Sequence, residues 1–161
     1  MSRHAPRQAE PSLQERYAAR STCYGCGPSN EMGLHIKSFP SGDDVVAEWR
    51  PEPHHEAYPG ALNGGVIGTL LDCHMNWTAS YHLMRRDRLA QPPATVTAEY
   101  AVRMLRPTPS GGSVRVVAHV VEDRADRAVV EARLEVDGIV CAMGRGTFVA
   151  VKPDHPAYQR W

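Results

Sequence analysis

The stretch that decides the fold is Tyr58-Pro-Gly-Ala-Leu-Asn-Gly-Gly-Val-Ile-Gly-Thr-Leu-Leu-Asp-Cys-His-Met-Asn-Trp-Thr-Ala-Ser-Tyr81. It predicts one long helix that begins at Asn63, a favoured N-cap residue, and continues to about Met84. Gly64 and Gly65 in the first turn each cost about 1 kcal/mol relative to alanine, which indicates that another group approaches the backbone there. The free amides of a helix N-terminus favour an anion or a developing oxyanion.

The predicted helix has two unlike faces. Apolar residues at helical spacing should point to the core: Val66, Ile67, Leu70, Leu71 and Met75. Small or polar residues recur at steps of three and four on another face: Gly65, Gly68, Asp72, Asn76 and Ala79. A carboxylate among small residues, two turns beyond the glycines, indicates a functional site. Close helix packing, with Asp72 as a surface residue, is the alternative interpretation.

Strands are predicted on both sides of the helix from the alternation of apolar and polar residues. They cover 33–39, 45–50, 95–104, 113–121, 127–136 and 139–151, with a turn at 40–43 and a hairpin signal at Asp137-Gly138. Gly144 and Gly146 suggest a bulge or a close backbone approach. We expect the last four strands to form a meander. One helix against one antiparallel sheet is an α+β architecture, and the pattern does not suit a doubly wound fold.

Three segments resemble one family of enzymes. Asn63-Gly-Gly followed by Leu71-Asp72 is similar to the His-Gly-Gly-(x)6-Asp segment of hotdog-fold acyl-CoA thioesterases of the phenylacetate-pathway type, the PaaI-like members of the 4-hydroxybenzoyl-CoA thioesterase superfamily. Cys23-Tyr-Gly-Cys-Gly-Pro-Ser-Asn-Glu-Met-Gly-Leu34 resembles their Cys-x-x-Cys-Gly-x-x-Asn-x-x-Gly-Leu opening, and Leu105-Arg-Pro107 resembles a strand end. Asn63 stands where the best-known members carry His. The resemblance implies a hotdog fold, an antiparallel sheet wrapped around one long central helix.

The resemblance also implies catalytic roles for Gly65, Asp72 and Asn63. The Gly65 amide would stabilise the oxyanion of a thioester, Asp72 would act as nucleophile or general base, and Asn63 would orient the carbonyl. Gly65 and Asp72 lie about 10 Å apart along one helix, so a single substrate cannot reach both in one chain. We therefore expect a homodimer, or a dimer of such dimers (a homotetramer), with Asp72 supplied by the second helix.

Further residues are candidates for substrate binding. Gly64 belongs to the helix start, Asn76 lies one turn beyond Asp72, and His54 and His55 occupy the loop before the site. His74 points about 160° away from Gly65, so we expect a core or interface histidine. CoA phosphates require cations, for which the candidates at strand ends are Arg103, Arg106 and Arg145. No cofactor is expected beyond CoA as part of the substrate.

Cys23-x-x-Cys26 has three interpretations. It is half of a zinc site that His54 or His55 would complete, a redox pair, or a turn whose small residues pack together. No second Cys-x-x-Cys is present in the sequence, so we favour the turn and assign no metal.

Composition narrows the partners. The 161 residues carry 18 basic and 18 acidic side chains, so the net charge of zero argues against nucleic-acid or membrane partners. No apolar run could span a membrane and no secretory signal is visible, so we expect a cytoplasmic protein. We divide the chain into an N-terminal tail at 1–22 with a short helix from Ser12 to Arg20, a hotdog domain at 23–152, and a C-terminal tail at 153–161.

Three functions remain open at this point. The first is hydrolysis of an acyl-CoA thioester. The second is non-catalytic acyl-CoA binding on the same scaffold, and the third is hydratase or dehydratase chemistry, since a fold does not determine a function. Asp72 in a nearly apolar helix favours hydrolysis.

Overall fold

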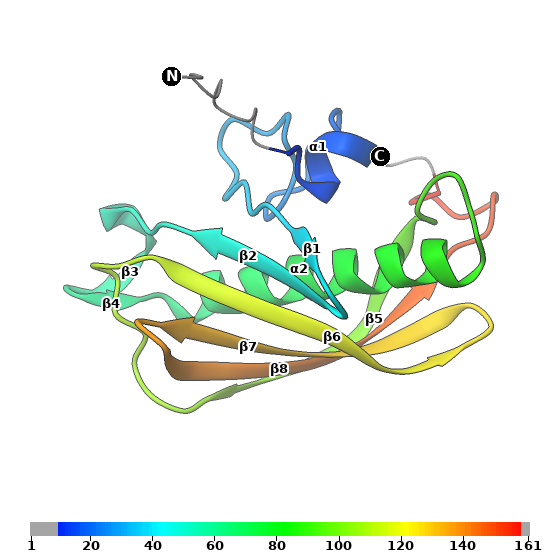
Figure 1. Cartoon of the computed structure of the whole chain (residues 1–161). Helices are drawn as coiled ribbons and strands as arrows, with labels where there is room; N and C mark the ends of the chain where they lie inside the picture. The colour runs from blue at the N-terminus through cyan, green and yellow to red at the C-terminus, as the bar shows by residue number, and fades with distance from the viewer. Residues whose placement is uncertain (1–9, 159–161) are drawn as a thin grey trace, which may run out of the picture.

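The computed structural model describes residues 10–158 and shows a six-stranded antiparallel sheet packed against one long helix, α2 (Gly64–Arg86) (Figure 1). The strand order is β1 (Phe39–Ser41), β2 (Asp44–Trp49), β6 (Val114–Arg124), β7 (Arg127–Val136), β8 (Ile139–Ala150) and β5 (Thr95–Met104). A short helix α1 (Leu13–Tyr17), a 3-10 turn η1 (Pro53–His55) and a small hairpin of β3 (Glu56–Tyr58) and β4 (Ala61–Leu62) complete the elements. The predicted α+β class is confirmed.

The core lies between α2 and the concave face of the sheet. Leu70, Leu71 and Met75 are fully buried, and Ile67 is nearly so, as the apolar face of the helix predicts. Gly144 of β8 allows this packing, because a Cβ atom there would lie 3.1 Å from the Met75 methyl group. The register of β8 is regular at this point, so Gly144 serves a close approach and not a bulge.

The N-terminal segment covers α2 on the side away from β7 and β8 (Figure 1). Helix α1 has the predicted capping box, in which Ser12 and Glu15 exchange side-chain and backbone hydrogen bonds. Leu13 is buried in the core, and Gln14 donates to Ser38 Oγ over 2.9 Å. The parts of the predicted tails at 1–9 and 159–161 lie outside the described residues.

The predicted strand at 33–39 is wrong. Leu34, Ile36 and Ser38 are buried and alternate with exposed residues, so the two-residue period was real. Residues 33–38 nevertheless form no ladder with the sheet, because Leu34 and Ile36 donate their N–H groups to the carbonyls of Tyr24 and Gly25 in the preceding loop. Strand β1 begins only at Phe39, and the turn falls at 42–43 within the predicted 40–43.

The predicted four-strand meander is also wrong in one respect. Strands β6, β7 and β8 are consecutive neighbours, joined between β7 and β8 by Asp137 and Gly138 with positive φ angles. Strand β5 pairs instead with β8 at the far edge, and β6 pairs with β2. The nine-residue connection 105–113, which contains Pro107 and Pro109, leads from the edge strand β5 to the interior strand β6, and it prevents a tight β5–β6 hairpin.

A bulge at Ala98 changes the face that β5 presents. Thr97 pairs with Phe148 and Glu99 with Thr147, so Ala98 has no partner of its own in β8. Thr97 on one side of the bulge and Tyr100 on the other both face α2, although simple alternation assigned them to opposite faces. A bulge inserts one residue and shifts the alternation in this way.

Candidate active site

Asn63 caps the start of α2, as predicted. Its Oδ1 atom accepts hydrogen bonds from the N–H groups of Gly65 at 2.8 Å and Val66 at 3.2 Å. The first amides of a helix have no partner within it, so a cap of this kind satisfies two of them. Among residues 10–158, the N–H of Gly64 has no hydrogen-bond acceptor. In the isolated chain, the open amide at this helix start is therefore that of Gly64, while that of Gly65 is bonded to the cap.

The cap also orients the Asn63 amide. Because Oδ1 must face the two N–H groups, the Nδ2 group faces away from them and keeps both of its hydrogens for other acceptors. The backbone of Asn63 donates to the carbonyl of His55 over 2.9 Å, which ties the cap to the preceding loop. The predicted pair His54 and His55 thus lies directly beside the helix start.

A groove of about 370 Å³ opens at this helix start. Its walls are mostly apolar, from Leu62, Ile67 and Met104, with Arg106 and Thr108 from the connection that follows β5. The Oγ1 atom of Thr108 is buried and has no hydrogen-bond partner within the described chain. A Cβ at Gly64 would meet only the Met104 methyl group, at 3.6 Å, so no backbone of this chain explains the glycine. The groove is therefore open to a ligand.

Asp72 is half-buried and lies along the edge strand β5. Its Oδ1 atom accepts a hydrogen bond of 2.8 Å from Thr97 Oγ1. One turn earlier on α2, a Cβ at Gly68 would lie 3.5 Å from the Tyr100 hydroxyl, and Gly64 faces Met104. The small face of α2 therefore lies along β5 and runs antiparallel to it.

The two histidines of η1 have unequal surroundings. His55 Nδ1 accepts from the backbone N–H of Glu52 at 2.9 Å, and its ring lies 4.9 Å from that of Trp49. Burial, together with the adjacent His54, lowers the pKa of His55. His54 is exposed and lies 3.6 Å from a carboxylate oxygen of Glu52. Neutral His55 is therefore favoured at the mouth of the site.

The remaining candidates are dispersed. Arg106 lines the groove, whereas Arg103 is exposed on β5. Arg145 projects from β8 and pairs with Glu131 and with Glu122, the latter over 3.5 Å. The structure therefore brings Arg106, and not Arg145, to the helix start.

Asn76 holds α2 to the start of β5. It is 9 % exposed, its Nδ2 lies 3.4 Å from the backbone carbonyl of Thr95, and its Oδ1 accepts from the Thr95 hydroxyl. These contacts use the side-chain amide within the chain, so a role in substrate binding remains a prediction.

His74 is a core residue, as expected. It is fully buried, with Nε2 at 2.8 Å from the Val45 carbonyl and Nδ1 at 2.8 Å from Ser38 Oγ. Burial lowers its pKa to about 4.

A larger hollow, of about 510 Å³, lies at the opposite end of α2. It is lined by charged side chains of both signs, among them Asp43, Asp44, Arg85 and Arg86. Arg86 is already bonded to Asp87 and to the carbonyls of Arg124 and Ala125. None of the predicted catalytic residues reaches this hollow, so we place the candidate site at the helix start.

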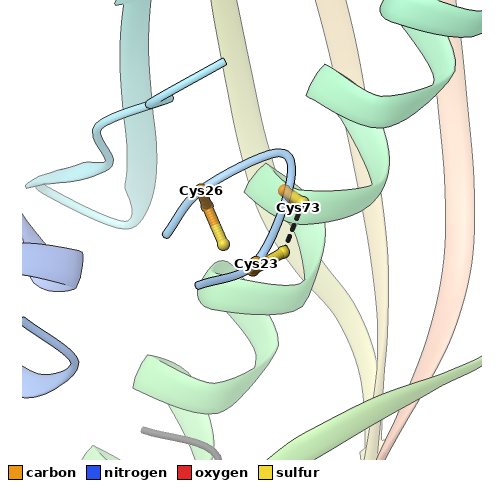
Figure 2. Close-up of side chains that lie close together, drawn as sticks. All are labelled: Cys23, Cys26 and Cys73. Atoms are coloured by element: carbon orange, nitrogen blue, oxygen red, sulfur yellow. Dashed lines mark hydrogen bonds between the residues drawn. The ribbon is translucent and has the colours of Figure 1, made fainter. Parts of the chain in front are cut away.

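The zinc site predicted as one alternative, with His54 or His55 completing Cys23 and Cys26, does not form. The two histidines gather with Glu52, whereas the two cysteines gather with Cys73 of α2 (Figure 2). Fifty residues separate Cys23 from Cys73, so spacing in the sequence did not link them.

Comparison with known proteins places this architecture in a family. A thioesterase superfamily protein from Shewanella loihica PV-4 is 32 % identical over 78 % of this chain and 98 % of its own, with a TM-score of 0.63. BH2602 from Bacillus halodurans, whose structure was solved with CoA, is 26 % identical over 74 % of this chain and 76 % of its own, with a TM-score of 0.60. E. coli PaaI, from the phenylacetic acid degradation operon, shares the fold at 16 % identity, with a TM-score of 0.60 over 74 % of this chain and 81 % of its own.

The chain belongs to the thioesterase superfamily and has its hotdog fold. No protein-family model and no curated protein matches it. Within residues 10–158, no helix combines the length and the apolar character needed to cross a membrane.

Proposed function

We propose that the protein hydrolyses an acyl-CoA thioester to the free acid and CoA. Membership of the thioesterase superfamily and the CoA bound to BH2602 support this class of substrate. The observation that carries the proposal is the position of Asp72, a half-buried carboxylate oriented by Thr97 along an edge strand that leads to the open helix start.

The site is completed by a second copy of the chain. Strand β5 is the last strand of the sheet, and Tyr100 and Met104 on it are 45 % and 51 % exposed. An antiparallel pairing of two β5 strands about a two-fold axis at Ala101 sets the bulge at Thr97 and Ala98 opposite Met104 of the partner subunit. Asp72 lies beside Thr97, and Gly64 lies beside Met104. Each Asp72 therefore faces the helix start of the other subunit.

The groups at this composite site have distinct roles. The amide of Gly64, and that of Gly65 if the cap opens, donates to the thioester oxygen as negative charge develops on it. Asn63 Nδ2 supplies a side-chain donor beside these amides. Asp72 either removes a proton from the attacking water or attacks the thioester carbon itself, and the C–S bond breaks with release of the CoA thiolate. In the second case the acyl group is held on Asp72 as a mixed anhydride, which water then hydrolyses to the free acid. Arg106, at the groove, is placed for a CoA phosphate.

The test is thiol release from a panel of acyl-CoAs that spans acetyl to palmitoyl and includes phenylacetyl and benzoyl. We expect turnover by the wild type and a loss of at least about 100-fold in Asp72→Asn, which keeps an acceptor for the Thr97 hydroxyl. Asp154→Asn, in the exposed loop after β8, is the matched control and should retain full activity.

Two outcomes would contradict the proposal. Full activity of Asp72→Asn would remove this carboxylate from the mechanism. Binding of CoA without thiol release from any member of the panel would identify a non-catalytic acyl-CoA-binding protein. In that case the Asn63 cap on the Gly65 amide would be the first suspect.

A further inference from the structure

Three cysteines from two distant segments meet on the covered side of α2 (Figure 2). Cys23 and Cys26 belong to the N-terminal loop, and Cys73 belongs to the helix. Their three sulfur atoms lie within 4.8 Å of one another, and those of Cys23 and Cys73 are 3.8 Å apart. All three residues are free thiols; Cys26 and Cys73 are buried, while Cys23 is partly exposed.

The local backbone is built around these sulfur atoms. A Cβ at Gly25 would lie 2.3 Å from the Cys73 sulfur, so only glycine lets the loop reach the helix here. A Cβ at Gly27 would lie 2.4 Å from the backbone nitrogen of Cys23, and the Gly27 N–H closes the turn on the Cys23 carbonyl at 2.8 Å. Both glycines of the Cys-Tyr-Gly-Cys-Gly turn are therefore required for the sulfur atoms to converge.

Hydrogen-bond donors point at the sulfur atoms. Trp77 Nε1 donates to Cys26 Sγ over 3.4 Å. Backbone N–H groups of Cys26 and Gly25 donate to the Cys23 sulfur. N–H donors of this kind stabilise thiolates and tune metal-bound sulfur, and a packed cluster of neutral thiols would not need them.

We propose that Cys23, Cys26 and Cys73 together bind one thiophilic metal ion, Zn²⁺, through their three sulfur atoms. Two thiolates on one tetrahedral zinc, each at a Zn–S distance of about 2.3 Å, lie about 3.8 Å apart, which matches the Cys23–Cys73 separation. Soft thiolate ligands select zinc over Mg²⁺ or Ca²⁺. Binding releases the three thiol protons to solvent. Because Cys23 is partly exposed, a water molecule would supply the fourth ligand.

The metal would tie the N-terminal loop to α2 at the residue next to Asp72. Hydrogen bonds between Trp77 and Cys26 and between Ser38 and His74 already join this segment to the helix. A zinc ion at Cys73 would add an attachment through metal–sulfur bonds, and it would fix the turn of the helix that carries Asp72.

The first experiment measures zinc in the full-length protein. Wild type, Cys23→Ser, Cys73→Ser and Cys141→Ser are expressed with zinc in the medium and moved into metal-free buffer, and their zinc is counted by mass spectrometry. We expect about one zinc per chain in the wild type and in Cys141→Ser, and a loss of at least about tenfold in the other two variants. Cys141 is the matched control, because it is also buried but lies outside the cluster.

A second measurement uses only the wild type, in case a variant fails to fold. Bound zinc should protect Cys23, Cys26 and Cys73 from alkylation, and a chelator should expose them without changing the labelling of Cys141. Co²⁺ added to the chelated protein should give the thiolate-to-metal absorption band. A wild type that binds no zinc and gives no such band would overturn the proposal, and so would a disulfide among these residues in the protein as isolated.

Discussion

At the scale of single residues, His74 is fully buried and both of its ring nitrogens are hydrogen-bonded. Its Nε2 faces the Val45 carbonyl, which can only accept, so the ring proton is on Nε2 and Nδ1 accepts from the Ser38 hydroxyl. Ser38 in turn accepts from Gln14. One neutral tautomer satisfies every group in this chain of hydrogen bonds, and a second proton on the ring would break it.

We predict that the protein becomes less stable as the pH is lowered from about 6.5 to about 4, because of this histidine. Its pKa is about 4 in the folded protein and 6.5 in the unfolded chain, so below pH 6.5 the unfolded state binds the proton first. The free energy of unfolding should drop by about 3 kcal/mol between pH 6.5 and pH 4. Urea unfolding of the wild type and of His74→Gln at several pH values measures the difference between the two curves, and parallel curves would contradict the prediction.

The candidate site was only partly predictable at this scale. Asn63, Gly64 and Asp72 stand out in the sequence because glycines and a carboxylate are unusual in an apolar helix. Thr97 carried no such signal, because it faces Asp72 only through the bulge at Ala98. Thr108 follows a proline in an irregular connection, and its burial depends on contacts that no local pattern encodes.

At the scale of elements, the start of α2 combines two functions in one side chain. Asn63 Oδ1 stabilises the helix, while Nδ2 is left to serve a ligand. The two functions can be separated, because aspartate keeps the acceptor and loses the donor.

We predict that Asn63→Ala lowers the free energy of unfolding by about 1 kcal/mol, the usual cost of a lost N-cap. Asn63→Asp should keep wild-type stability, since a carboxylate also caps and suits the positive end of the helix dipole. Its turnover of an acyl-CoA should nevertheless fall. Urea unfolding and thiol release on the same preparations test both halves, and equal turnover in Asn63→Asp and wild type would exclude a role for Nδ2.

The boundaries of the long elements follow from the sequence. Strands 95–104 and 127–136 were predicted to the residue, and the helix to within two residues, because their alternation and flanking turns are strong. Segment 33–39 failed although its alternation was equally clear. The two-residue alternation requires only that one side of the segment is buried. A strand also needs a neighbouring strand to which its backbone can hydrogen-bond, and that depends on distant parts of the chain.

At the scale of the whole molecule, the open edge of β5 is the main unpaired surface of the described sheet. A ten-residue edge strand with exposed Tyr100 and Met104 invites pairing with another chain. The proposed dimer would bury this edge.

We predict that Ala101→Glu weakens the dimer, because two introduced carboxylates would lie close together beside the two-fold axis. Sedimentation velocity should show the wild type as a dimer or a dimer of dimers, and the variant shifted toward monomer at the same concentration. Thiol release should decline in parallel, since each site needs both subunits. A variant that remains dimeric would place the interface elsewhere.

The strand order was the part of the fold that the residues alone could not supply. Local patterns identify strands, but the pairing of β5 with β8 depends on the path of the connection 105–113. Its two prolines show that no tight hairpin forms there, and that indication was available in the sequence.

The covered face of α2 has a consequence for how the chain is made. Residues 10–38 leave the ribosome before α2, which they cover, and α2 itself packs on β6, β7 and β8, which are made later still. Synthesis proceeds at about 5–20 residues per second. The first segment must therefore wait several seconds, with its apolar side chains and thiols unprotected, until the last strands provide the support for its docking site.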